Sequence, residues 1–229
     1  MILGIDASTY LDELSHGAKY FDGDRQIDPL DAFRANGVDC MRIRVWNDPH
    51  SPAGESYLAG DCDMDHYICL GKLAKAKGYR LLLDFHYSDF WADPAKQMAP
   101  KAWKDMDIDT KSQALYEYTK SCLEQLRDAG VEIGMVQVGN ETNGVMCGED
   151  ASALGGWKKI TQLMSAGSKA VREVCPDALV VIHFANPEKV TNYESYGKNL
   201  EYYGVDYDVF ASSYYPFLAR HFGKSFFRA

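Results

Sequence analysis

The sequence lacks several features that would place it in familiar protein classes. It has no run of about 18 apolar residues, so we expect no membrane-spanning helix. It also has no excess of basic residues, because 24 Lys and Arg against 33 Asp and Glu give a formal net charge of −9 over 229 residues. Since a nucleic-acid-binding protein needs a basic face, we expect no nucleic-acid partner and no membrane partner.

A Cys-x-x-Cys pair is also missing, and zinc is therefore not expected. The cysteines are scattered and are expected to be reduced thiols: Cys40, Cys62, Cys69, Cys122, Cys147 and Cys175. The first residues, "MILGIDASTY", contain no basic segment and no cleavage site, so no signal peptide is recognised. As given, the sequence predicts a cytoplasmic protein, or a secreted one if a leader has been removed.

Short apolar runs alternate with longer amphipathic segments. The predicted strands are residues 2–8, 40–46, 79–85, 134–140, 179–185 and 207–215. The predicted helices are 28–36, 65–77, 109–129, 152–174 and 190–203. "RANGVD", "KAKGYR" and "RDAGVE" each place a glycine just after a helix with a basic residue in its last turn, which is a helix stop signal. The alternation predicts an α/β fold with a parallel sheet.

An open doubly wound sheet and a (β/α)8 TIM barrel both fit this pattern. The open sheet usually carries a glycine-rich phosphate loop after its first strand, and "DASTYLDELSHG" has none. A barrel instead gathers polar residues at the C-terminal ends of its strands. Here those residues are Asp6, Ser8, Arg44, Trp46, Asp84, His86, Asn140, Glu141, His183, Asn186, Tyr214 and Tyr215. We predict a (β/α)8 barrel that is incomplete, with about six βα units where closure needs eight.

The run "MRIRVW" places Arg42, Arg44 and Trp46 on one face of a strand. Because a buried arginine is costly without a partner, we expect carboxylates nearby, and Asp84 and Glu141 are the candidates. A buried ion pair that only holds the strands in register is the alternative.

The segment "LLLDFHYSDFWADP" carries the highest density of polar and aromatic residues. Asp84 and His86 share a strand face, and Trp91 follows in the loop. Carboxylates and an imidazole beside aromatic rings are typical of sugar recognition. A metal site built from Asp84, His86 and Asp89 is the weaker interpretation, since no helix-spaced histidine pair supports it, and we expect no metal.

The stretch "VQVGNETNG" ends an apolar strand in Asn140 and Glu141. A carboxyl group enclosed at this position can stay protonated near neutrality, as a general acid must. Asn140 can hydrogen-bond a substrate hydroxyl. The alternative is a glutamate that caps a loop.

The sequence resembles glycoside hydrolase family 53, the arabinogalactan endo-β-1,4-galactanases, from Gly4 to about Phe217. The resemblance is carried by the three segments quoted above together with "KAW", "YTK" and "SSYYPF". The resemblance implies a partial catalytic domain over residues 1–217 that needs no cofactor, takes galactan or galacto-oligosaccharide as its partner and is monomeric when full-length. It implies that Glu141 is the general acid/base of a retaining hydrolase and that Asn140 is its substrate-binding neighbour. It further implies cleft-lining or supporting roles for Asp6, Arg44, Trp46, His86, Trp91, His183 and Tyr214. Asp84 and Asn186, which also end strands, join this substrate-binding set.

In the family the nucleophile is a glutamate at the end of the seventh strand, and the chain ends after the sixth, so we expect the nucleophile to be absent. None of Asp6, Asp84 or Asp89 matches its motif. Residues 218–229, "LARHFGKSFFRA", depart from the family pattern, and we hypothesise that a frameshift after Phe217 produced this tail. On this basis the chain alone is expected to be inactive.

Three functional interpretations remain open at this point. The first is a retaining endo-β-1,4-galactanase that is catalytically complete only at full length. The second is a non-catalytic galactan-binding fragment. The third is another β-glycosidase of the same clan, a mannanase or a glucanase.

Overall fold

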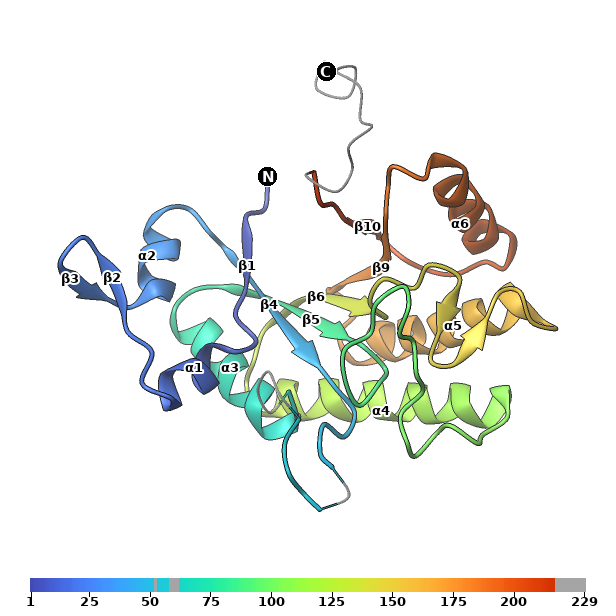
Figure 1. Ribbon diagram of the computed structural model, residues 1–229, viewed down its shortest axis with the longest axis horizontal. Coiled ribbons are helices and arrows are strands. Elements are labelled where there is room, and N and C mark those ends of the chain that lie inside the picture. The colour runs from blue at the N-terminus through green and yellow to red at the C-terminus, as the bar shows by residue number, and fades with distance from the viewer. Residues whose placement is uncertain (52, 58–61, 217–229) are drawn as a thin grey trace.

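A six-stranded parallel sheet forms the centre of the molecule in the computed structural model (Figure 1). The structure describes residues 1–51, 53–57 and 62–216. The strands, in spatial order, are β1 (Gly4–Asp6), β4 (Cys40–Val45), β5 (Arg80–Phe85), β6 (Ile133–Val138), β9 (Leu179–Ala185) and β10 (Val209–Ser213). Spatial order follows chain order and every neighbouring pair is parallel, which is the arrangement of a (β/α)8 barrel. The predicted fold is confirmed, with six of the eight strands of such a barrel.

Six α-helices flank the sheet in the part of the chain that the structure describes. They are α1 (Tyr10–Ser15), α2 (Pro29–Ala35), α3 (Met64–Ala76), α4 (Ile108–Asp128), α5 (Gly156–Val174) and α6 (Val190–Tyr202). Helix α3 packs against β4 and β5, α5 packs against β6 and β9, and α4 lies along α5 below the sheet in Figure 1. Leu83, Val136 and Ile182 are fully buried in this layer. Each such side chain contributes about 1.5–3 kcal/mol of stabilisation.

The ends of the helices are set by local sequence. The carboxylates of Asp28, Asp63 and Asp107 accept backbone N–H bonds at the N-termini of α2, α3 and α4. The glycines that follow these three helices adopt positive φ angles of 87°, 74° and 74°: Gly37, Gly78 and Gly130. These are the three glycines that the stop signals identified, and a residue with a Cβ would be strained there.

Several elements differ from the sequence-based expectation. Helix α1 and the hairpins β2 (Tyr20–Asp22)–β3 (Arg25–Ile27) and β7 (Val145–Met146)–β8 (Glu149–Asp150) were not predicted, because they are too short to show a period. The helix expected from Ser152 begins at Gly156. All six cysteines are free thiols, four of them buried. In the part of the chain that the structure describes, no helix is long and apolar enough to cross a membrane. Phe217 and the tail at 218–229 lie outside the described residues.

The inner face of the sheet is polar near the C-terminal ends of its strands. Asp6 is the register partner of Arg42, and Asp84 is the partner of both Arg44 and Gln137. Register partners in a parallel sheet point to the same side. Strands far apart in sequence therefore bring charged and amide groups together at one edge of the sheet.

Candidate active site

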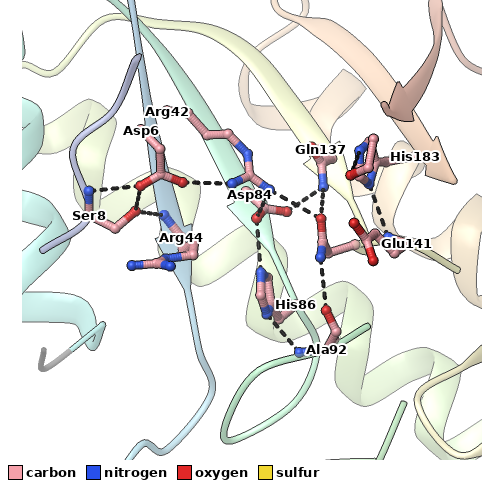
Figure 2. Close-up of polar contacts among 12 residues, drawn as sticks. Asp6, Ser8, Arg42, Arg44, Asp84, His86, Ala92, Gln137, Glu141 and His183 are labelled. Atoms are coloured by element: carbon pink, nitrogen blue, oxygen red, sulfur yellow. Dashed lines mark hydrogen bonds and ion pairs between the residues drawn. The ribbon is translucent and has the colours of Figure 1, made fainter. Parts of the chain in front are cut away.

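A pocket of ≈ 370 Å³ lies at this edge of the sheet. Its walls come from β4, from the loop after β5, from the turn after β6, and from β9 and β10. Its lining residues are Arg42, His86, Trp91, Ala92, Asp93, Asn140, Glu141, His183, Ser212, Ser213 and Tyr215. Figure 2 shows the polar contacts that connect several of them.

Arg42 links two carboxylates across three strands. Its Nη1 lies 2.6 Å from Asp6 Oδ2 and its Nη2 lies 2.5 Å from Asp84 Oδ2. Burial alone would lower the pKa of Arg42, but Asp84 and Asp6 raise it above its usual value. Burial would likewise raise the pKa of Asp84, which is fully buried, yet Arg42 and His86 hold it below its usual range. The expected pairing of Arg42 with Asp84 is confirmed, and Asp84 is ionised at neutral pH.

Arg44 behaves differently from the prediction. No carboxylate pairs with it among the described residues, and its guanidinium lies 4.1 Å from the ring centroid of Trp91. The oxygens of Asp84 already accept from Arg42, His86 and Gln137. The expectation of an ion-paired Arg44 is therefore wrong, and a cation–π contact stabilises this side chain.

His86 is held in one tautomer by groups that can only donate. Its Nδ1 accepts from Trp46 Nε1–H at 3.2 Å and from the backbone N–H of Ala92 at 3.0 Å. Its Nε2 lies 2.9 Å from Asp84 Oδ2. Because Nδ1 must be unprotonated to accept these bonds, the proton sits on Nε2 and is donated to Asp84.

Glu141 occupies a strained position in the turn after β6. Its φ angle is 51°, in the left-handed region that disfavours a non-glycine residue. The strain is held by neighbours, since its backbone N–H donates to Nδ1 of His183 at 3.0 Å and the next residue, Thr142, donates twice to the His183 carbonyl. The residue is 9% exposed and lines the pocket. A carboxyl group kept in such a conformation is typical of a functional site.

His183 is neutral in this arrangement. Burial lowers its pKa from 6.5 to about 4, against the opposing effect of Asp84. Its Nε2 lies 3.3 Å from Ser213 Oγ, so the ring bridges β10 and the turn that carries Glu141.

The structure brings some of the predicted site residues together and not others. His86, Trp91, Asn140, Glu141 and His183 line the pocket. The remaining predicted residues, which do not line it, are Asp6, Arg44, Trp46, Asp84, Asn186 and Tyr214.

Arg44 stacks on Trp91, and Asn186 Oδ1 accepts a hydrogen bond from Asn143 Nδ2 at 3.2 Å. The other four residues lie in three places. Trp46 and Asp84 have no exposed surface, so in this conformation they support the lining and do not face a ligand. Asp6 borders a separate hollow beside α1. Tyr214 is exposed outside the lining, and its neighbour Tyr215 is a lining residue.

Sequence reasoning missed some residues of the site. Arg42 was identified as inward-facing but was not assigned to the pocket, and Gln137, Asp93, Ser212 and Ser213 were not identified. Gln137 gave one usable signal, because it is the polar residue within the apolar run "MVQV". Among the described residues no group of three or more His, Cys, Asp or Glu side chains could hold a metal ion.

The fold and the pocket together define a class, namely a (β/α)8-type protein with a carboxyl group and an amide at the C-terminal end of one strand. Comparison with known proteins makes this specific. The model for glycosyl hydrolase family 53 matches residues 2–225, and the chain belongs to this family.

Named relatives agree with this assignment. The chain is 46% identical over 218 residues to the endo-beta-1,4-galactanase of Bacillus subtilis (strain 168), covering 94% of this chain and 49% of that protein. It is 38% identical over 224 residues to the arabinogalactan endo-beta-1,4-galactanase of Cellvibrio japonicus (strain Ueda107), covering 93% and 57%. The solved family 53 catalytic domain of Ignisphaera aggregans superposes with a TM-score of 0.88 at 38% identity, covering 95% and 60%. The chain thus spans about half the length of the curated relatives it matches.

Proposed function

We propose that this chain forms the acid/base half of the active site of a retaining endo-β-1,4-galactanase. The observation that carries the proposal is the placement of Glu141. Its carboxyl group lies at the pocket on a backbone that His183 holds in a strained conformation, directly beside Asn140. In this proposal Glu141 donates a proton to the leaving sugar oxygen and later removes one from the attacking water.

Asn140 and the aromatic wall are proposed to bind the sugar. Asn140 Nδ2 donates one N–H to the Ala92 carbonyl at 2.8 Å, and its second N–H is proposed to reach a substrate hydroxyl. Trp91 offers a partly exposed indole at the pocket on which a sugar ring can stack. His86 and His183 are proposed as further contacts, and Trp46, Asp84, Asp6 and Arg44 as the layer that supports them. Asn186 and Tyr214 are proposed to lie at the rim.

A retaining mechanism also needs a nucleophilic carboxylate about 5–5.5 Å from the acid/base. Three aspartates at or after the strand ends are engaged in other contacts. Asp84 is buried beneath the pocket, Asp6 is paired with Arg42, and Asp89 accepts backbone N–H bonds of Asp48 and Lys101. We therefore propose that the nucleophile comes from a seventh strand of the barrel, which is not among the six strands of the parallel sheet described above, and that the 229-residue chain binds substrate without hydrolysing it.

The relatives named as endo-β-1,4-galactanases support β-1,4-galactan as the proposed substrate class. Two measurements test the proposal. Reducing-sugar release from β-1,4-galactan, with mannan and glucan as controls, is measured for the chain and for a version extended by two βα units. We expect the extended protein to cleave galactan preferentially. Preference for mannan or glucan would reassign the substrate.

Titration of β-1,4-galactotetraose into the 229-residue chain measures binding without hydrolysis. We expect saturable binding that is weakened by Asn140→Ala. Hydrolysis of galactan by the 229-residue chain itself would show that the nucleophile has been misplaced.

A further inference from the structure

The side-chain amide nitrogen of Gln137 is surrounded by three oxygen atoms that accept hydrogen bonds. Gln137 is the penultimate residue of β6 and is 3% exposed. Its Nε2 lies 2.5 Å from Asp84 Oδ1, 3.0 Å from the Gly139 carbonyl oxygen and 3.1 Å from Asn140 Oδ1. All three partners are oxygens that accept, so the amide nitrogen must face them, and the reversed orientation would bring oxygen against oxygen.

This contact helps to orient Asn140. Asn140 Oδ1 accepts from Gln137 Nε2 and from Arg42 Nη2, both at 3.1 Å. Its Nδ2 donates to the Ala92 carbonyl at 2.8 Å. A flipped Asn140 amide would place its N–H groups against two donors and its oxygen against a carbonyl. The three partner groups, on Gln137, Arg42 and Ala92, therefore fix which end of the Asn140 amide faces the pocket.

Gln137 also donates a hydrogen bond to the buried carboxylate of Asp84, which lies beneath Asn140. Asp84 Oδ2 accepts from both Arg42 and His86, whereas Oδ1 accepts from Gln137 alone among the described residues (Figure 2). Arg42 Nη2 is shared between Asp84 and Asn140. If the donor at residue 137 were lost, Asp84 would compete with Asn140 for the same guanidinium.

We infer that Gln137 is a positioning residue: by donating to both Asp84 and Asn140, it holds the Asn140 amide with an N–H toward the sugar. The part of this inference that concerns contact with the sugar rests on the proposed function. The orientation of Asn140, in contrast, can be measured without any substrate.

Three variants test the inference. Gln137→Met keeps the volume and removes the donor. Gln137→Glu keeps the shape and can donate only when it is protonated. Gln125→Met is the matched control, since Gln125 is exposed on α4, away from the pocket, and its side chain donates hydrogen bonds to Ser121 within the same helix.

The first readout is the side-chain amide signal of Asn140 in the 15N–1H NMR spectrum, identified by its loss in Asn140→Asp. We expect Gln137→Met to shift this signal and to speed its exchange with solvent about tenfold, while Gln125→Met leaves it unchanged. An unaltered Asn140 amide in folded Gln137→Met would overturn the inference, because Arg42 alone would then suffice.

In Gln137→Glu the Asn140 amide signal is expected to depend on pH, which a simple loss of packing would not cause. Burial and the neighbouring Asp84 raise the pKa of an introduced carboxyl. Below that pKa the protonated group donates to Asp84, and above it two carboxylates repel. The groups that act on Asp84 from the surrounding strands are Arg42, His86 and His183. We expect wild-type-like Asn140 signals at low pH and altered signals as the pH rises; a pH-independent signal would overturn the inference even if the methionine variant does not fold.

The second readout is affinity for β-1,4-galactotetraose. We expect Gln137→Met to raise the Kd about tenfold, as for loss of a hydrogen bond to a charged group. If wild-type chain binds no oligosaccharide, the proposed function fails, and the NMR result still decides the role of Gln137. If wild-type chain binds and Gln137→Met alters the Asn140 amide without changing the Kd, the positioning role in binding is overturned.

Discussion

The Nδ1 atom of His183 accepts the backbone N–H of Glu141 at 3.0 Å, across 42 residues of sequence. This hydrogen bond needs an unprotonated Nδ1, and it helps to hold Glu141 at a φ angle of 51°. The protonation of a buried histidine is thereby linked to the conformation of the proposed acid/base.

The first prediction concerns the stability of the chain as pH falls. Because the pKa of His183 is lowered from 6.5 to about 4, the unfolded chain binds more protons than the folded chain between these values. The contribution of neutral His183 to the free energy of unfolding is therefore fully present above pH 6.5. It is lost as the pH falls toward 4, by about 3 kcal/mol in total.

Urea denaturation between pH 7.5 and 4 measures this effect. His183→Asn is the comparison, since an asparagine oxygen can accept the Glu141 N–H and does not titrate. We expect wild-type stability to fall more steeply than that of the variant. Parallel curves would show that His183 does not contribute to this loss.

The second prediction concerns the acid/base role of Glu141. In the version extended by two βα units, Glu141→Gln is expected to retain galactotetraose affinity and to lower turnover of galactan by about 10²–10⁴-fold. The variant keeps the shape of the side chain but has no proton to give to the leaving oxygen. Activated aryl galactosides, whose leaving groups need little protonation, should lose less in the glycosylation step. Wild-type turnover of galactan by this variant would reassign the role.

The third prediction separates the strain at Glu141 from its chemistry. Asparagine tolerates the left-handed region better than glutamate or glutamine. A left-handed residue costs about 1–2 kcal/mol, so Glu141→Asn should have a free energy of unfolding about 1 kcal/mol higher than that of Glu141→Gln. Urea denaturation of the two variants makes the comparison at equal charge. Equal stabilities would show that the turn is not strained at this residue.

The fourth prediction concerns Trp91. Trp91→Ala removes both the proposed stacking surface and the ring under Arg44, a contact worth about 0.5–2 kcal/mol. We expect weaker binding of longer galacto-oligosaccharides together with a lower free energy of unfolding. Trp91→Phe, which keeps an aromatic face, should recover part of each. If Trp91→Ala lowers stability and leaves affinity unchanged, Trp91 serves only to pack the loop.

The six strands of the parallel sheet and the helices α2 to α6 could be predicted from the sequence because their determinants are local, whereas the short helix α1 could not. The apolar runs and the glycines after α2, α3 and α4 each act within a few residues. Hairpins β2–β3 and β7–β8 could not be predicted, since two or three residues per strand show no period.

The site was only partly predictable. Glu141 and His183 both lie near the C-terminal ends of strands, which predicts that they share one edge of the sheet. The hydrogen bond between them depends on the turn after β6, which the sequence does not reveal. Trp46 and Trp91 both follow strands in aromatic-rich segments. Only the packing of the loop after β5 decides that Trp46 is buried and that Trp91 lines the pocket. The choice between Tyr214 and Tyr215 depends in the same way on how the chain leaves β10.

The stacking of Arg44 on Trp91 sets the surroundings of this indole, on which its intrinsic fluorescence depends. Trp46 is 0% and Trp103 7% exposed, whereas Trp91 lies at the pocket beside a guanidinium. A ligand entering the pocket would change the surroundings of this indole while leaving the two buried ones in place. Intrinsic fluorescence can therefore report occupancy without a label, and replacing Trp157, which packs against Tyr196, with phenylalanine would remove the remaining partly exposed indole from the emission.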